Sequence, residues 1–191
     1  MPTTPVTAFA EVLDTLAHLV ESVEEERWSA PTPCADWNVR QLVEHLMAGQ
    51  HTFAAAMGAG PSLPPVGADA TSEGLKKTFR ASSAVQVAAF ERPGALESAV
   101  QVPIGEVPGA VALRLQTLEH LAHGWDLARA TGRKALFDEA TVERETEFAH
   151  RVTAQLPPGP GAPFAAPART APEDASALDR LAALLGRDVT G

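Results

Sequence analysis

The sequence predicts an all-α fold. Apolar residues recur at spacings of three and four in six segments, which is the periodicity of helices with one buried face. Proline- and glycine-rich stretches separate these segments. Only Leu96 to Val107 alternates weakly instead, and because it contains Pro103 and Gly105 we expect a hairpin-like excursion and not a central strand. With 191 residues, 45% of them hydrophobic, the chain fits one domain.

Two helices are expected before residue 60. The first begins at Thr4, which caps it ahead of a proline, and runs to about residue 28, where further prolines end it. The second begins at Asn38, an N-cap whose hydrogen bond Gln41 can return as a capping box, and it ends near residue 58. His45 lies at the flank of its apolar stripe, from where the side chain can reach a neighbouring helix.

A long connection and two more helices follow. Residues 58–70 are rich in glycine and proline and are expected to cross one end of a helical bundle. The third helix covers 71–91 and has a face of small residues, and a Pro-Gly pair ends it. The fourth begins at Pro108 or Val111 and runs to Ala130, with Gly132 as its C-terminal signal.

The C-terminal part is expected to add helices to the same domain. Asp138 caps a fifth helix that reaches about Leu156, so that residues 1–156 form the helical bundle. Residues 157–171 read as a proline-rich linker. A short helix over 172–186, within the closing segment 172–191, is expected to pack back on the bundle.

Charge and hydropathy exclude two classes of partner. The formal net charge is -9 and Lys and Arg form no run, so the long-range attraction that nucleic acids or anionic lipids require is missing. No stretch approaches the roughly 20 apolar residues of a membrane span, and the N-terminus has neither region of a secretion signal. We therefore expect a cytoplasmic protein that binds neither nucleic acid nor membrane.

The fourth helix concentrates side chains that can bind a metal. Glu119 and His123 are four residues apart and so lie one above the other, and Asp126 is close to the same line. The core direction of this helix is set by five apolar residues, Val111, Leu115, Leu118, Ala122 and Trp125. Glu119 and Asp126 lie beside that face, with His123 a little further round. His120 points almost the opposite way, so we expect it to be exposed.

These residues are candidate ligands of one ion. Cys34 is the only cysteine, which excludes an internal disulfide and a thiolate-rich zinc site and leaves histidine and carboxylate as ligands. A catalytic Zn²⁺ takes three protein ligands and keeps one position open. Glu119 and His123 supply two ligands, and His45 is the natural third. A Glu/His pair at this spacing is also common as a local electrostatic contact, so this alternative stays open here.

Two longer motifs resemble a known family. TPCADWNVRQLVEHL (residues 32–46) and, later in the chain, EHLAHGWDLARATGR (residues 119–133) resemble the DinB-like superfamily, in its actinobacterial branch of mycothiol-dependent maleylpyruvate isomerase N-terminal domains. The closing PEDASALDRLAALLGRD (residues 172–188) is similar to the C-terminal end of that group. The resemblance covers nearly the whole chain. Its motifs are specific for the superfamily but not for one reaction.

The resemblance implies a bundle of four long helices with a divalent metal at one end, held by His45, Glu119 and His123. It implies mycothiol or a similar small thiol as cosubstrate, whose thiolate the metal stabilises for attack on an electrophilic substrate. We expect a metal-assisted thiol S-transferase or isomerase, with no catalytic side chain assigned. Zn²⁺ is the first choice, and Ni²⁺, Fe²⁺ or Mn²⁺ also suit these ligands. At 191 residues the chain is expected to lack the further C-terminal domain of the full isomerase.

Further residues are candidates for supporting roles. Asp126 is expected either to orient His123 or a metal-bound water, or to form a surface pair with Arg129 or Arg133. Arg80, on the third helix, is a candidate for binding an anionic substrate.

The aromatic and thiol groups near these motifs are read as packing residues. Trp37 and Trp125 are expected in the core rather than as substrate platforms. Trp125 also stays, with Asp126 and Arg80, a candidate for a supporting or substrate-binding role. Cys34 follows a proline in the loop before the second helix and is read as a packed thiol, although its position also suits a reactive one.

Two other functions stay open on the sequence. In one, the metal site is retained without catalysis in a stress-response or binding protein, where the ion stabilises the bundle end. In the other, the chain is a metal-free helical dimerisation module. A homodimer also stays open, because dimers are the commonest soluble assembly.

Overall fold

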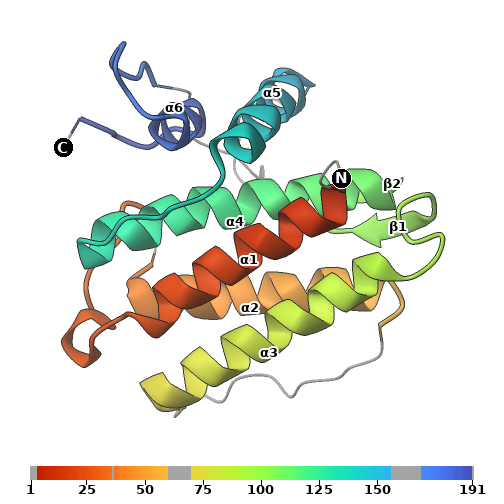
Figure 1. The fold of residues 1–191 in the computed structure, drawn as a ribbon, viewed down its shortest axis with the longest axis horizontal. Coiled ribbons are helices and arrows are strands. Elements are labelled where there is room, and N and C mark those ends of the chain that lie inside the picture. Colours follow the sequence, from red (N-terminus) through yellow and green to blue (C-terminus); the bar gives the residue numbers. More distant parts are fainter. Residues whose placement is uncertain (1–3, 36, 60–69, 156–168, 191) are drawn as a thin grey trace.

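The computed structural model describes residues 4–35, 37–59, 70–155 and 169–190. Its elements are α1 (Pro5–Glu21), a 3₁₀ turn (Glu25–Arg27), α2 (Val39–Ala56), α3 (Ser72–Glu91), β1 (Ala99–Val102), β2 (Gly105–Pro108), α4 (Gly109–Thr131), α5 (Glu139–Gln155) and α6 (Ala177–Leu184). Helices α1 to α4 form a bundle in which α1 and α2 each contact both α3 and α4 (Figure 1). Helices α5 and α6 pack on each other and on α4. The predicted all-α fold is confirmed.

The helix starts follow local capping chemistry. The Thr4 hydroxyl accepts a hydrogen bond from the Thr7 backbone N–H, and Asn38 and Gln41 form the full capping box. The C-terminus of α4 is likewise set locally: Gly132, which follows the helix, has a φ of 68°, which a residue with a Cβ rarely adopts. These three boundaries were predicted because capping depends on near neighbours in the sequence.

Two predicted boundaries were wrong. The first helix ends at Glu21 and not near residue 28, because the chain turns at Ser22 and continues as the short 3₁₀ helix. The last helix begins at Ala177 and not at 172, because the Ser176 hydroxyl caps it by accepting from the Asp179 backbone N–H. Most of the predicted linker (residues 157–168) and most of the 58–70 connection (residues 60–69) lie outside the described residues.

The excursion before α4 is a hairpin, as predicted. Strands β1 and β2 pair antiparallel, with Val100 opposite Val107 and Val102 opposite Gly105. Val100 and Val102 are buried and pack with the end of the bundle, whereas the alternate residues of β1 are exposed. The hairpin thus covers the bundle end that lies away from the C-terminus of α4 (Figure 1).

Helix α4 is the centre of the molecule. It is covered by α1 and α2 on one side and by α5 and α6 on the other, so most of its side chains are buried, on both of these sides (Figure 1). Leu113, Leu118 and Leu127 each belong to a different apolar cluster of the core. Three of the ligand-type side chains of this helix, His120, His123 and Asp126, are therefore buried, and Glu119 is partly exposed.

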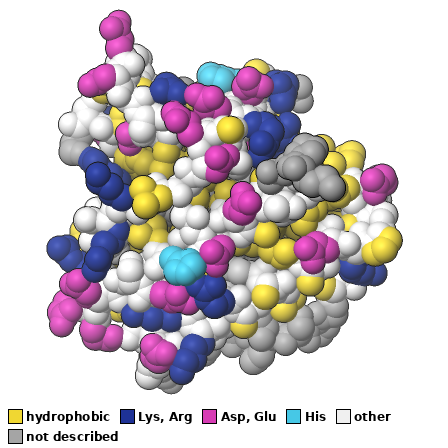
Figure 2. Space-filling model, in the orientation of Figure 1, with side chains coloured by type: hydrophobic (Ala, Val, Ile, Leu, Met, Phe, Trp, Pro, Cys, Tyr) yellow, Lys and Arg dark blue, Asp and Glu magenta, His cyan; other side chains and the backbone are white. Residues whose placement is uncertain are grey.

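The surface carries mixed charges. On the face shown in Figure 2, acidic and basic side chains are interspersed. Within the described ranges, no helix combines the length and the apolar character that a bilayer crossing requires.

Gly109 is a point where a side chain does not fit. A Cβ on this residue would lie 2.0 Å from the Ala95 carbonyl oxygen and 3.1 Å from the Leu96 Cα, which are backbone atoms of the segment packed against the start of α4. We expect Gly109→Ala to lower the free energy of unfolding by about 1–3 kcal/mol through overpacking. Urea unfolding measures the change.

The matched control for this prediction is Gly49→Ala within α2. A Cβ there meets only the Gln116 Oε1 at 3.9 Å, which is ordinary contact. Alanine is preferred in helices by up to about 1 kcal/mol, so this variant is expected to be as stable as the native protein or more so. Equal unfolding free energies for the two variants would contradict the packing argument at Gly109.

Candidate metal centre

The three predicted ligands converge between two neighbouring helices. His45 extends from α2, and Glu119 and His123 extend from α4. The Nε2 atom of His45 lies 2.8 Å from the Glu119 Oε1, and the Nε2 atom of His123 lies 3.4 Å from the same oxygen. One donor atom from each residue falls within 4.8 Å of the others. The packing of α2 against α4 thus brings together residues that are 74 positions apart in the sequence.

The cluster is open on one side and buried on the other. The side chains of His45 and Glu119 are 34% and 24% exposed, whereas that of His123 is 7% exposed. Trp37, in the loop before α2, stacks on the His45 ring at 4.1 Å between centroids and meets the His123 ring edge-on at 5.6 Å. We had expected Trp37 in the core. It lies at the edge of the core, where it also forms one wall of the cluster.

Asp126 holds the second nitrogen of His123. Its Oδ2 lies 2.9 Å from the His123 Nδ1, and the carboxylate is fully buried. Of the two roles considered for Asp126, the structure shows the contact with His123 and none with Arg129 or Arg133. An outer carboxylate of this kind fixes which imidazole nitrogen carries the proton and which one faces the ion.

The cation that accompanies Asp126 is Arg187, which the sequence did not single out. Its Nη2 and Nε atoms lie 2.9 and 3.3 Å from the two Asp126 oxygens. Arg187 follows α6 and is 61 residues from its partner. A buried carboxylate requires a counter-charge or several donors. The sequence offers several arginines for that role, and only the packing of α6 selects this one.

The charges of the cluster are strongly coupled. Burial alone would raise the pKa of Glu119, but hydrogen bonds with His123 and His45 hold it well below its usual range. Burial would likewise lower the pKa of His123, but the contacts with Asp126 and Glu119 outweigh it and raise the pKa to about 9. Without an ion, His123 therefore carries a proton that a metal would have to displace from Nε2.

Asp126 and Arg187 each shift the pKa of the other toward its charged form. Burial would raise the pKa of the Asp126 carboxyl, but His123 and Arg187 lower it. Burial would lower the pKa of the Arg187 guanidinium, and Asp126 raises it instead. Both groups are thus held as ions in the folded protein.

The expected exposure of His120 is wrong. The residue is 0% exposed and points into the bundle. Its Nδ1 lies 2.6 Å from the Gln116 carbonyl oxygen, and its Nε2 lies 3.2 Å from the Gln50 Nε2. It takes no part in the metal cluster, because it extends toward α2 and α3 at a deeper level of the bundle.

Arg80 and Trp125 lie away from the cluster. Arg80 forms ion pairs with Asp14 and Glu21 on α1, on the α1–α3 side of the bundle. Trp125 is buried, as expected, and its indole N–H donates to the Asp179 carboxylate at 2.7 Å. The hydrogen-bond partners of these two side chains are thus Asp14, Glu21 and Asp179, and not the three candidate ligands.

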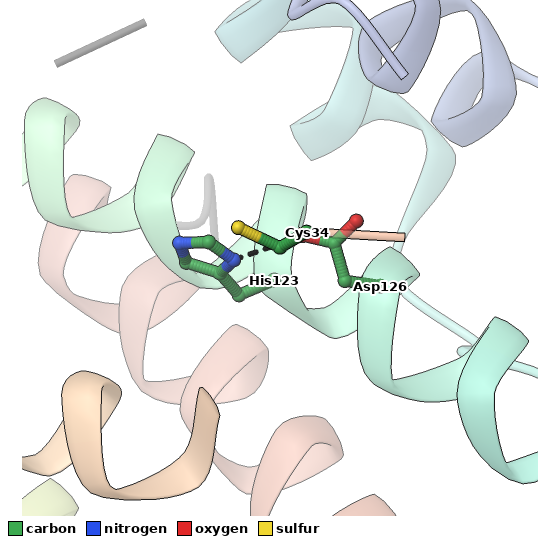
Figure 3. Close-up of side chains that lie close together, drawn as sticks. All are labelled: Cys34, His123 and Asp126. Carbon is green, nitrogen blue, oxygen red and sulfur yellow. Dashed lines mark hydrogen bonds and ion pairs between the residues drawn. The ribbon is translucent and has the colours of Figure 1, made fainter. Parts of the chain in front are cut away.

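Cys34 is a neighbour of the cluster. The half-buried thiol lies beside the His123 ring and Asp126 (Figure 3), with one donor atom of each residue within 4.8 Å of the others. Sequence reasoning placed Cys34 near the second helix but not beside these two side chains.

The donor set fits a divalent ion. Two imidazoles and one carboxylate form a common catalytic zinc set, and in a tetrahedral site with bonds of about 2.0–2.1 Å the ligand atoms are about 3.3 Å apart. The distances of 2.8 and 3.4 Å between Glu119 and the two histidines are close to that spacing. The Nδ1 contact with Asp126 also leaves Nε2 of His123 as the nitrogen that faces the cluster.

Comparisons with known proteins agree on one family. The family model of the mycothiol maleylpyruvate isomerase N-terminal domain matches residues 9–128. Two curated proteins of Mycobacterium tuberculosis, both described as uncharacterized, are 37% identical over 186 residues, which are 97% of this chain and 98% of theirs.

Solved structures show the same fold. Two crystal structures of mycothiol-dependent maleylpyruvate isomerase, one of them a mutant, align with TM-scores of 0.62 and 0.59 at 16% and 17% identity. Each alignment covers 79% of this chain and 70% of the other. The family match and the relatives together make the assignment: the chain belongs to the family of the mycothiol maleylpyruvate isomerase N-terminal domain.

Proposed function

We propose that this protein binds a divalent metal through His45, Glu119 and His123 and uses a small thiol, mycothiol or a similar compound, as cosubstrate of an S-transferase or isomerase reaction. The observation that carries the proposal is that the Nε2 atoms of His45 and His123 converge on the Glu119 Oε1. Asp126 holds the other nitrogen of His123, Nδ1. The dependence on mycothiol that the names of the related crystal structures record supports the choice of thiol. Such a protein would work in the cytoplasm, where thiols are kept reduced.

The metal would supply Lewis acidity, which lowers the pKa of a coordinating thiol and raises the fraction of nucleophilic thiolate at neutral pH. The protein residues would position the reactants. His45 and Glu119 form the exposed rim from which a thiol can approach, and the buried His123 anchors the inner side. Trp37 covers the His45 ring and limits water on that side.

The reaction class follows from the nucleophile. A thiolate would form a C–S bond with an electrophilic carbon of a small substrate. It would either displace a leaving group, which departs with its bonding electron pair, or add to a double bond and later be expelled as the double bond re-forms in the isomer. Zn²⁺ is the ion we propose, and Ni²⁺, Fe²⁺ and Mn²⁺ accept the same nitrogen and oxygen donors. The chain's part is to orient the thiol and to shield it from bulk water.

Thiol binding provides the direct test. Isothermal titration of zinc-loaded protein with mycothiol is expected to show one binding event per chain, and the metal-free protein is expected to show none. His45→Ala is the matched variant, because it removes a rim ligand that is one-third exposed. Stoichiometric zinc without binding of mycothiol would reject the thiol part of the proposal and leave the metal part standing.

A second function is favoured by the burial of the inner half of the cluster. His123 and Asp126 are almost entirely shielded, as expected for an ion that only stabilises the bundle. A structural ion present at 100 times its dissociation constant would add about 2.7 kcal/mol to the free energy of unfolding. A rise in the unfolding temperature with zinc, combined with no effect of mycothiol on the zinc environment, would select this alternative.

A further inference from the structure

Arg187 donates a hydrogen bond to the protein from each of its three guanidinium nitrogens. The Nε and Nη2 atoms face the two oxygens of Asp126 at 3.3 and 2.9 Å, and Nη1 donates to the Leu185 carbonyl oxygen at 3.0 Å. Each nitrogen of the guanidinium thus has an acceptor from the chain itself. The side chain is 15% exposed, so most of it is shielded from water.

This arrangement differs from that of an arginine that binds a substrate. Recognition of a carboxylate or phosphate by arginine uses two parallel N–H groups of one edge. In Arg187 the Nε–Nη2 edge already contacts Asp126. This edge of the guanidinium is therefore taken up by the protein and is not free to bind a ligand.

Asp126 transmits the effect of Arg187 to His123. Its Oδ2 lies 2.9 Å from both the His123 Nδ1 and the Arg187 Nη2, and its Oδ1 contacts the Arg187 Nε. A carboxylate held at both oxygens cannot rotate about its Cβ–Cγ bond without breaking a charge-assisted bond. Because Asp126 is fully buried, water has little access to it and could not easily take the place of Arg187 if that side chain were removed.

The position of Arg187 depends on how α6 ends. Gly186 adopts a φ of 88°, and the Arg187 backbone N–H donates to the Ala182 carbonyl at 2.9 Å, which turns the chain back over the helix. Helix α6 in turn contacts α4 and α5. Gly186 and Arg187 lie outside the range 9–128 that the family model matches, whereas Asp126 and His123 lie inside it.

We propose that Arg187 is a positioning residue of the metal centre: by fixing the Asp126 carboxylate, it keeps the N–H of His123 on Nδ1 and directs Nε2 toward Glu119 and the ion. The inference rests on the proposed function, because it takes His123 as a ligand. It makes the C-terminal segment a functional part of the site.

Arg187→Gln is the central test, with Arg180→Gln as the matched control. Arg180 lies on α6 and pairs with Glu143 on α5. Its substitution therefore removes the same charge from the same segment without affecting a contact of Asp126. Competition with a chromophoric chelator measures zinc affinity. We expect Arg187→Gln to weaken zinc binding by about 10–100-fold, the usual cost of losing an outer partner, and Arg180→Gln to leave it unchanged.

A spectroscopic readout separates positioning from general stability. In protein labelled with ¹⁵N-histidine, the His123 Nδ1–H should give a slowly exchanging signal with and without zinc, and Arg187→Gln should lose it. Arg187→Lys retains the charge but not the two-pronged geometry, so it should also lose the signal. Native zinc affinity and a retained signal in Arg187→Gln, or full rescue by lysine, would overturn the inference. Failure of native protein to bind zinc would overturn the proposed function instead, and the signal in metal-free protein would still decide the role of Arg187.

Discussion

Replacing His123 with alanine is expected to abolish stoichiometric binding of a divalent metal. His123 is the inner donor of the cluster, and its Nε2 lies 3.4 Å from the Glu119 Oε1. Loss of an outer partner costs about 10–100-fold in metal affinity, so loss of a ligand itself should cost more than about 100-fold. Elemental analysis after dialysis against a weak chelator gives the metal content per chain.

A second ligand variant and a histidine control complete this experiment. His45→Ala removes the ligand on α2, and because that side chain is 34% exposed the packing of the bundle should change little. His18→Ala removes an exposed histidine of α1 that hydrogen-bonds only within its own helix turn, to the Asp14 carbonyl oxygen. It should retain the native metal content. Unchanged metal in both ligand variants would rule out the proposed site.

The juxtaposition of Glu119 and His123 on α4 was predictable because helical geometry is local. Glu119 and His123 are four residues apart, which places them on one face of any helix, whatever the rest of the fold. His45 required a step of tertiary reasoning, that α2 lies beside α4. Arg187 could not be predicted, because the partner of a buried carboxylate is decided by how α6 packs and not by any spacing in the sequence.

Helix ends show the same division between local and tertiary information. The caps at Thr4 and Asn38 were predicted from neighbouring residues alone. The end of α1 at Glu21 was missed because the apolar pattern continues after the turn. Val23 and Trp28 are buried, at 1% and 5% exposure, although neither belongs to the helix. Periodicity reports burial, and here burial continues in a segment of different backbone structure.

His120 was misplaced because a helical wheel assumes one buried face. That assumption holds for a helix at the surface of a bundle. Helix α4 is packed on both sides, so the direction opposite the first core face is also interior. Sequence positions around a central helix therefore do not separate buried from exposed histidines.

The surroundings of His120 require a neutral imidazole. The short Nδ1 contact with the Gln116 carbonyl places the proton on Nδ1, and Nε2 then accepts from the Gln50 amide. Gln50 cannot easily reverse its amide, because its Oε1 accepts from the Ser82 hydroxyl and its Nε2 also donates to Ser83. A second proton on His120 would thus face a donor.

The free energy of unfolding is expected to depend on pH through His120. Burial lowers the pKa of this residue in the folded protein to about 4, from about 6.5 for a histidine exposed to water. Between these values the unfolded chain binds the proton and the folded protein does not. The stability that His120 contributes is therefore complete above pH 6.5 and is lost as the pH falls toward 4, by about 3 kcal/mol in total.

His120→Gln should remove this dependence, since glutamine does not titrate. In urea unfolding at a series of pH values, the stability advantage of native protein over His120→Gln should shrink by about 3 kcal/mol between pH 7 and pH 4. Leu118→Ala, at another fully buried position of α4, is the control for destabilisation without titration, and its difference from native protein should stay constant. If the difference in unfolding free energy between native protein and His120→Gln also stayed constant with pH, the prediction would be contradicted. The imidazole would then gain a proton as readily in the folded protein as in the unfolded chain, despite the Gln50 donor next to Nε2.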